Sequence, residues 1–196
     1  SEGKAYSNAV LLILIKAATA FDFIKTQSFT VINKSLIATK VDTAKREVLE
    51  FNNQPAAVAY AEAVGVPVES VADHFMSNPV GLMTGDEPYV RSPQRLEGQR
   101  IVFYCNLLEG MELSLLKSED IVQDTKTAIE KKNKEFGPIS GIINFHCILR
   151  TLELKNKNQT EAYGKLFSDI PTIGFSTYGE EFVGHINQTA TMLVFK

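Results

Sequence analysis

The pattern of apolar and polar positions divides the chain into a strand-rich first part and a last third in which helices and strands alternate. In the first part, short apolar runs and apolar–polar alternation lie between turn residues, which is typical of strands. The predicted strands are Val10–Ile15, Phe29–Ile32, Leu36–Val41, Glu47–Phe51, Val80–Met83, Tyr89–Arg91, Arg100–Cys105 and Glu112–Leu116. Their close spacing favours antiparallel meanders.

Two helical segments interrupt these strands. Ala56–Val64 is rich in alanine, follows Pro55 and ends before Gly65, so both its composition and its borders indicate a helix. A second short helix is predicted at Ser70–Phe75, and Asn78-Pro79 ends it.

The last third begins with an amphipathic helix. Ser118 is the predicted cap, the apolar stripe starts at Ile121, and the helix runs to about Phe136, where Gly137 ends it. The further predicted elements are a strand at Gly141–Cys147, a helix from Ile148, a helix at Gln159–Phe167, and strands at Ile170–Phe175 and Ala190–Phe195. The whole pattern predicts an α+β fold, with mixed or mainly antiparallel sheets and helices packed on their faces.

Composition narrows the class of protein. The hydrophobic and charged fractions of 44% and 22% are those of an ordinary globular protein, and a net charge of -3 argues against a nucleic-acid partner. The apolar run Val10–Ile15 is too short to span a membrane and is followed by Lys16, so no membrane insertion is expected. Cys105 and Cys147 are too few for a disulfide framework, which favours a reduced, cytoplasmic protein.

No pattern in the sequence predicts a metal, a cofactor or an enzyme. His74, His146 and His185 lack the close spacing of metal ligands. Neither a phosphate-binding loop nor a nucleophile elbow is present. We therefore expect a non-catalytic protein.

The segment Gly174–Val194 is the first candidate site. Phe175, Tyr178 and Glu180 stand beside Gly174 and Gly179, so aromatic surface, a hydroxyl and a carboxylate lie where the backbone can turn or approach a ligand. The alternative is a cluster that only closes the sheet.

The second candidate is the turn from Cys147 to Arg150, which we expect to meet the first segment at one edge of the sheet. Helix N-terminal amides would lower the pKa of the Cys147 thiol, and Arg150 offers a fork for a carboxylate. An amino acid could then bind with its carboxylate on Arg150 and its ammonium group on Glu180. Cys147 is otherwise a small core residue, with Arg150 a paired or structural charge. Because neighbouring strand residues face opposite sides, His146 should point away from Cys147.

Several motifs, in order, carry a family resemblance. They are Ala38-Thr39-Lys40-Val41, Leu49-Glu50-Phe51, Gln54-Pro55-Ala56, Tyr89-Val90-Arg91, Glu109 to Leu113, Ile143 to Arg150, Ile173 to Glu180, and Asn187-Gln188-Thr189. In this order the chain resembles the C-terminal half of a FIST sensory domain over residues 38–196, and residues 1–37 resemble strands at the tail of the N-terminal half. The bulky Ile148-Leu149 departs from the small residue and arginine that often follow the cysteine in that family.

The resemblance implies a signal-input module that binds a small, amino-acid-like ligand and passes the signal to an output domain or partner protein. It adds Asn187 to the candidate ligand-binding residues. The alternative function is a thiol-dependent enzyme or redox sensor centred on Cys147. A pure protein-interaction scaffold is a third possibility.

Overall fold

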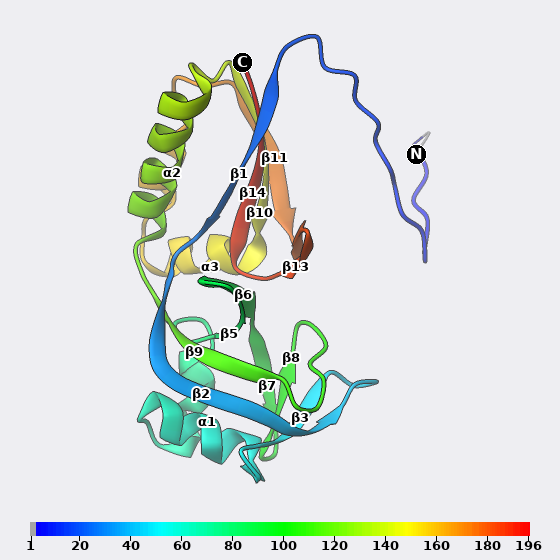
Figure 1. Cartoon of the computed structure of the whole chain (residues 1–196), viewed down its shortest axis with the longest axis vertical. Coiled ribbons are helices and arrows are strands. Elements are labelled where there is room, and N and C mark those ends of the chain that lie inside the picture. Colours follow the sequence, from blue (N-terminus) through cyan, green and yellow to red (C-terminus); the bar gives the residue numbers. More distant parts are fainter. Residues whose placement is uncertain (1–2) are drawn as a thin grey trace.

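The strands form two main sheets that are stacked along the long axis of the molecule (Figure 1). The computed structural model describes residues 3–196, so the first two positions of the predicted 1–37 segment lie outside it. The upper sheet has the order β1 (Phe21–Gln27), β14 (Thr189–Phe195), β10 (Gly141–Cys147) and β11 (Thr172–Thr177). All its pairs are antiparallel except β10 with β11, which are parallel.

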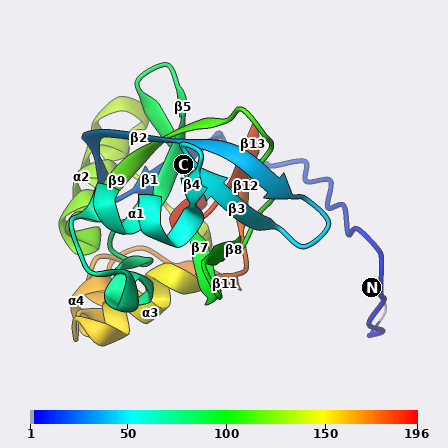
Figure 2. The same cartoon turned by 90° about the horizontal axis from the view of Figure 1, so that it is seen from below.

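The lower sheet is antiparallel and curved. Its order is β6 (Glu87–Arg91), β5 (Val80–Thr84), β9 (Glu112–Ser118), β2 (Phe29–Asp42), β3 (Glu47–Phe51), β8 (Arg100–Phe103) and β7 (Pro93–Glu97), with β4 (Gln54–Pro55) paired to β3. A small hairpin of β12 (Glu180–Phe182) and β13 (Gly184–Ile186) lies at the level where the two sheets meet (Figures 1 and 2).

Helices cover each sheet separately, which confirms the predicted α+β class. In the lower layer they are α1 (Ala56–Val64) and the 3-10 helix η1 (Val68–His74); in the upper layer, α2 (Ile121–Phe136), α3 (Ile148–Asn156) and α4 (Thr160–Lys165). None of the helices within residues 3–196 is long and apolar enough to cross a membrane.

Two hydrophobic clusters form the core, one in each layer. Small alanine side chains let α1 approach the lower sheet closely, so that Tyr60 and Phe51 are fully buried there. In the upper layer, Ile129 of α2 packs against Met192 and Val194 of the central strand β14. Each cluster combines one face of a sheet with the apolar stripe of its helices.

Local signals placed the helix ends well, with one correction. Gly65 has a φ of 86° and its N–H bonds to the carbonyl of Ala61, as a glycine at a helix end should. The predicted cap of α2, Ser118, is wrong: Asp120 accepts from the N–H groups of Val122 and Gln123 at 2.8 and 3.0 Å. An acidic cap also suits the positive end of the helix dipole.

The N-terminal apolar run is the main correction to the fold. Val10–Ile15 is not a buried strand; it has no regular structure, and its side chains are 53% to 101% exposed. The segment runs alongside the body of the molecule (Figure 1). The first strand is β1 instead, and Phe29–Ile32 and Leu36–Val41 are parts of the single long strand β2. The predicted division between residues 37 and 38 therefore falls within one strand.

Candidate ligand-binding site

The two candidate segments do meet at one edge of the upper sheet. The parallel pairing of β10 with β11 places Cys147 opposite Thr177, so the end of β10 and the start of the Gly174–Val194 segment lie side by side. The edge strand β11 has β10 as its partner. The expected juxtaposition of these two segments is thus confirmed.

Cys147 lies at the N-terminus of α3 and is 1% exposed. Burial raises the pKa of its thiol to about 11, and the neighbouring Glu180 carboxylate adds to this increase. Backbone N–H groups of Leu149, Gln188 and Arg150 act in the opposite direction, but their effect is smaller. The expected activation by helix amides is therefore outweighed by desolvation.

This burial predicts a slow thiol. A rise in pKa from 9.0 to about 11 lowers the thiolate fraction near neutral pH by about 100-fold. In a Cys105→Ser background, we expect iodoacetamide to modify Cys147 at least about 100-fold more slowly than a peptide with the same flanking residues. The denatured chain is the control and should react at the peptide rate. Equal rates for the folded chain and the peptide would contradict the burial argument and restore the thiol-centred function.

Glu180 belongs to a buried polar cluster and is 3% exposed. The hydroxyls of Thr177 and Thr189 donate to its two carboxylate oxygens, the second at 2.8 Å. Burial raises the pKa of Glu180, while these two hydrogen bonds and one with Cys147 lower it. Its carboxylate oxygens are thus already engaged with neighbouring side chains.

Arg150 points away from this cluster. It is 1% exposed, and its guanidinium donates to the hydroxyls of Ser28 at 3.4 Å and Thr125 at 3.1 Å, between β1 and α2. None of the ion pairs formed within residues 3–196 includes it. A clamp in which Arg150 and Glu180 hold one amino acid therefore stays a prediction.

Asn187 connects the two layers. Its backbone N–H donates to the carbonyl of Val90 at 3.1 Å, and its side-chain oxygen accepts from the N–H of Ser92 at 3.3 Å. The neighbouring Gln188 also bonds across this junction, to Ser92 at 2.7 Å and to the Met76 carbonyl at 2.9 Å. These contacts give Asn187 a structural role between the hairpin and the lower sheet.

Both predicted glycines stand at close approaches, Gly174 to backbone atoms and Gly179 to the end of a side chain. A Cβ at Gly174 would lie 1.9 Å from the backbone oxygen of Asn144, and one at Gly179 would lie 2.5 Å from Cε1 of His185. Both distances are shorter than any real contact, so a side chain at either position would displace a neighbour. Phe175 and Tyr178, in contrast, are 64% and 87% exposed.

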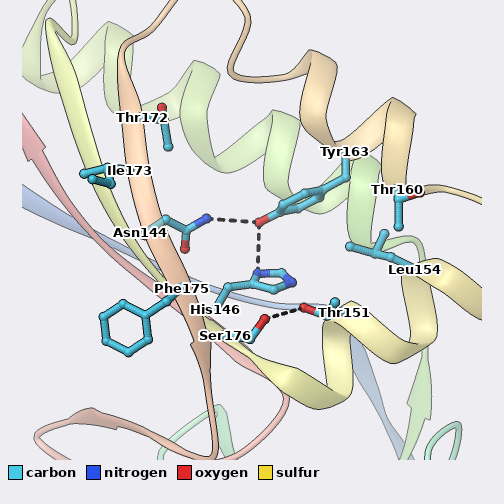
Figure 3. Close-up of a pocket in the computed structure, with 11 residues that line it drawn as sticks. Asn144, His146, Thr151, Leu154, Thr160, Tyr163, Thr172, Ile173, Phe175 and Ser176 are labelled. Atoms are coloured by element: carbon cyan, nitrogen blue, oxygen red, sulfur yellow. Dashed lines mark hydrogen bonds between the residues drawn. The ribbon is translucent and has the colours of Figure 1, made fainter.

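An open pocket of about 290 Å³ lies between β11 on one side and α3 and α4 on the other (Figure 3). Its lining residues are Asn144, His146, Thr151, Leu154, Thr160, Tyr163, Thr172, Ile173, Gly174, Phe175 and Ser176. Of the eight residues predicted from the sequence, Gly174 and Phe175 are in this set. The other lining residues had been missed, although β10 itself was predicted.

The floor of the pocket is polar and buried. Asn144 and His146 are each 8% exposed and face the same side of β10, because they are two residues apart in a strand. The Tyr163 hydroxyl accepts from Nδ2 of Asn144 at 3.5 Å and lies 3.1 Å from Nδ1 of His146 (Figure 3). Oδ1 of Asn144 and Nε2 of His146 are buried with no partner among the described residues.

One arrangement of hydrogens satisfies this network with a neutral imidazole. The Tyr163 oxygen accepts from Asn144 and donates its own proton to Nδ1 of His146, and the ring hydrogen is then on Nε2. Burial, and next the charge of Arg150, lower the pKa of His146 to about 3, so the ring is neutral at physiological pH. The floor therefore holds one unpaired donor and one unpaired acceptor.

Metal binding finds no support in the part of the chain that the structure describes, where no three His, Cys, Asp or Glu side chains come together. His185 lies near Cys105, whereas Cys147 contacts Glu180. His146 bonds to Tyr163 and Cys147 contacts Glu180, as expected if the two side chains face opposite sides of β10.

A comparison with known protein families shows to which of them the chain is related. The FIST C domain family matches residues 56–182, which is more than half of the chain. The chain belongs to the FIST C domain family. Searches of curated proteins and of solved structures found no match. FIST C domains are sensory, signal-transduction domains, so a role in signal input follows from family membership.

The matched range of this FIST C domain includes the whole pocket. Asn144, His146, Tyr163 and the strand β11 all lie within residues 56–182. The apolar N-terminal run and the last strand, β14, lie outside that range. The alternation of polar residues on β10 could have identified Asn144 and His146, but their pairing with Tyr163 depends on how α4 folds back.

Proposed function

We propose that this FIST C domain is the ligand-binding part of a signal-input module, and that its ligand occupies the pocket between β11 and helices α3 and α4. One observation carries the proposal: a pocket of about 290 Å³ is lined by Asn144 and His146, whose buried Oδ1 and Nε2 atoms have no partner within residues 3–196. Buried polar atoms are nearly always hydrogen-bonded, so an unpaired donor and acceptor at one pocket favour a ligand that supplies both.

The lining favours an uncharged ligand. None of the described residues that line the pocket is Asp, Glu, Lys or Arg, and its imidazole is neutral. A charged ligand would lose its hydration without gaining an opposite charge. A carboxamide matches best, since its carbonyl can accept from Nε2 of His146 and its N–H can donate to Oδ1 of Asn144. Amino acids with a side-chain amide belong to the class expected from the resemblance, and they could place the amide on the floor while the ammonium and carboxylate groups stay in solvent at the open mouth of the pocket.

Helix α4 is the element best placed to report binding. It is six residues long and has no buried residue, so few contacts hold it. The Tyr163 hydroxyl ties it to the floor through Asn144 and His146. A ligand bonded to Oδ1 of Asn144 and Nε2 of His146 would reorient the two side chains that hold Tyr163 and so shift α4, and an output domain or partner protein in contact with α4 would receive the signal.

Thermal unfolding in the presence of a metabolite panel tests this function. The panel contains glutamine, asparagine and nicotinamide as carboxamides, with glutamate, aspartate and nicotinate as their acid counterparts. We expect the carboxamides to raise Tm and the acids to leave it unchanged, because a ligand stabilises the folded state it binds.

Matched tyrosine variants assign any effect to the pocket. Tyr163→Phe removes the hydroxyl above the floor and should change the ligand-induced shift in Tm; it should also destabilise the free protein by about 1–3 kcal/mol, since Asn144 and His146 lose their partner. Tyr178→Phe removes an exposed hydroxyl outside the pocket and should behave like the parent. The proposal fails if no carboxamide raises Tm in the parent, or if both variants respond to ligand as the parent does.

A further inference from the structure

A second cavity, of about 330 Å³, lies where the β12–β13 hairpin meets the lower sheet. It is lined by Arg46, Arg91, Tyr104, Cys105, Asn106 and His185. These residues come from four places in the chain: the β2–β3 turn, the end of β6, the segment after β8, and β13. We propose that Arg46, Arg91 and His185 bind the phosphate group of a small phosphorylated metabolite, at a site separate from the pocket beside α4.

Cationic groups converge here without acidic partners. Neither Arg46 nor Arg91 takes part in any of the ion pairs formed within residues 3–196, although the chain as a whole has a net charge of -3. Among residues 3–196, none of those that line the cavity carries a carboxylate. Two unpaired guanidinium groups at one cavity of an acidic protein are therefore a local positive centre that an anion would neutralise.

Both arginines are held by backbone carbonyls and keep further donors free. Nη1 of Arg46 donates to the carbonyl of Tyr104 at 3.2 Å, and Nη1 of Arg91 donates to the carbonyls of Val90, at 3.4 Å, and His185. A guanidinium has five N–H donors, so each group remains able to hold an oxyanion. The backbone bonds orient both side chains before any ligand arrives, which reduces the entropy lost on binding.

His185 is the third phosphate-binding group of the proposed site. Its Nε2 is hydrogen-bonded to Asn187 at 3.2 Å, which leaves Nδ1 for a ligand. Burial lowers its pKa, and the charges of Arg91 and Arg46 lower it further, while Asn187 and the facing Glu181 act in the opposite direction. An anion between the arginines would cancel their effect and favour the protonated ring.

Charge and oxygen count favour phosphate over a carboxylate. A phosphomonoester carries up to two charges and three terminal oxygens, enough to meet two guanidinium forks and one imidazole at once. A carboxylate has one charge and two oxygens, so it would leave one cation unmatched. The metabolite must be small, since the cavity has to hold the remainder of the molecule as well.

The site also has a structural consequence for signalling. Arg91 belongs to the lower sheet and His185 to the hairpin, so a bound phosphate group would bridge the two layers. The hairpin is the same segment that supplies Glu180 and Asn187. Anion binding would thus stabilise the docked position of the hairpin.

The test uses the full chain, with inorganic phosphate and glycerol 3-phosphate as probes and sodium chloride at matched ionic strength as the reference. Calorimetry gives affinities, and imidazole NMR signals, assigned by comparison with His185→Gln, follow the protonation of His185. We expect both probes to bind, glycerol 3-phosphate more tightly, and to raise the pKa of His185 but not that of His74. Acetate should bind at least tenfold more weakly.

Variants of two arginines distinguish specific binding in this cavity from general electrostatic attraction of anions. Arg46→Gln should weaken glycerol 3-phosphate at least tenfold, as the loss of a charged hydrogen bond predicts. Arg46 is exposed, so its replacement should leave the fold intact. Arg95→Gln removes an exposed arginine outside the cavity and should bind as the parent does.

Four outcomes would overturn the proposal: His185 signals that follow chloride and phosphate equally, acetate binding as tightly as glycerol 3-phosphate, equal affinities of Arg46→Gln and the parent, or equal losses in Arg46→Gln and Arg95→Gln. None of them bears on the carboxamide pocket, whose lining residues are different.

Discussion

Replacing Gly174 with alanine is expected to destabilise the protein by about 3 kcal/mol or more, although the change adds a single methyl group. The new Cβ would lie 1.9 Å from the Asn144 backbone oxygen and 2.8 Å from its carbonyl carbon. Both atoms belong to the backbone of β10 and cannot rotate away. Because β11 is paired with β10 at the edge of the sheet, we expect β11 to separate from β10 and the pocket wall to be lost.

Urea denaturation checks this expectation, with Gly141→Ala as the matched control. Gly141 is also on β10, but a Cβ there would lie 3.7 Å from the Pro171 oxygen, an ordinary contact. We expect Gly141→Ala to change the free energy of unfolding by less than about 1 kcal/mol. Similar losses in the two variants would show that the close approach of β10 and β11 is not what requires glycine at position 174.

Acid is expected to destabilise the protein through His146. Its pKa is about 3 in the folded protein and 6.5 in the unfolded chain. Below pH 6.5 the unfolded chain therefore binds a proton that the folded protein does not. The stability linked to His146 is complete above pH 6.5 and is lost as the pH falls toward 3, by about 1.4 kcal/mol for each pH unit.

The measurement is the free energy of unfolding of the parent and of His146→Gln at several pH values. Between pH 6.5 and 4.5 the parent should lose about 2 kcal/mol more than the variant, whatever their difference at neutral pH. His185, whose pKa is also lowered, contributes to both proteins and cancels. His74→Gln is the control and should retain the steep acid dependence of the parent. If His146→Gln and the parent lose stability in parallel, the imidazole is not held neutral by burial.

The helices were predictable because their signals are local. Alanine content and the glycine at position 65 determine α1, and the apolar stripe of α2 ends at a glycine as expected. The cap of α2 was predicted at Ser118 because a serine precedes the apolar stripe. The structure has Asp120 as the cap, because Asp120 directly precedes the first helical residue and its carboxylate is therefore closer to the free N–H groups.

Strand pairing was less accessible from the sequence. The apolar run Val10–Ile15 indicates a segment with strong β propensity, but propensity does not show what covers it, and in this structure its side chains are exposed. The alternating segment Phe21–Gln27 has a weaker apolar signal and yet forms β1, since β14 offers it a full set of partners. Tertiary pairing decided between the two segments.

The candidate site, too, was predictable where the signals are local and not where tertiary packing decides. The sequence placed Cys147 at a strand end and brought it next to the Gly174–Val194 segment, and both placements are confirmed. Burial, which raises the pKa of the Cys147 thiol and removes Arg150 from the surface, depends on the packing of α2 and the β12–β13 hairpin. The polar floor of the pocket likewise exists because Tyr163, on a separate helix, reaches back to β10.

The position of β14 determines the order in which the chain can fold during synthesis. The strands and helices of the lower layer lie within residues 29–118, so that layer can form while the rest of the chain is still being translated. The upper sheet has to wait, because its last strand in sequence stands between β1 and β10. Until residues 189–195 leave the ribosome, β1 lacks the strand with which it pairs, and Ile24 lacks the side chains of β14 that it packs against in the folded protein. The pocket residues of β10 are thus assembled into the complete upper sheet only after β14 has been made.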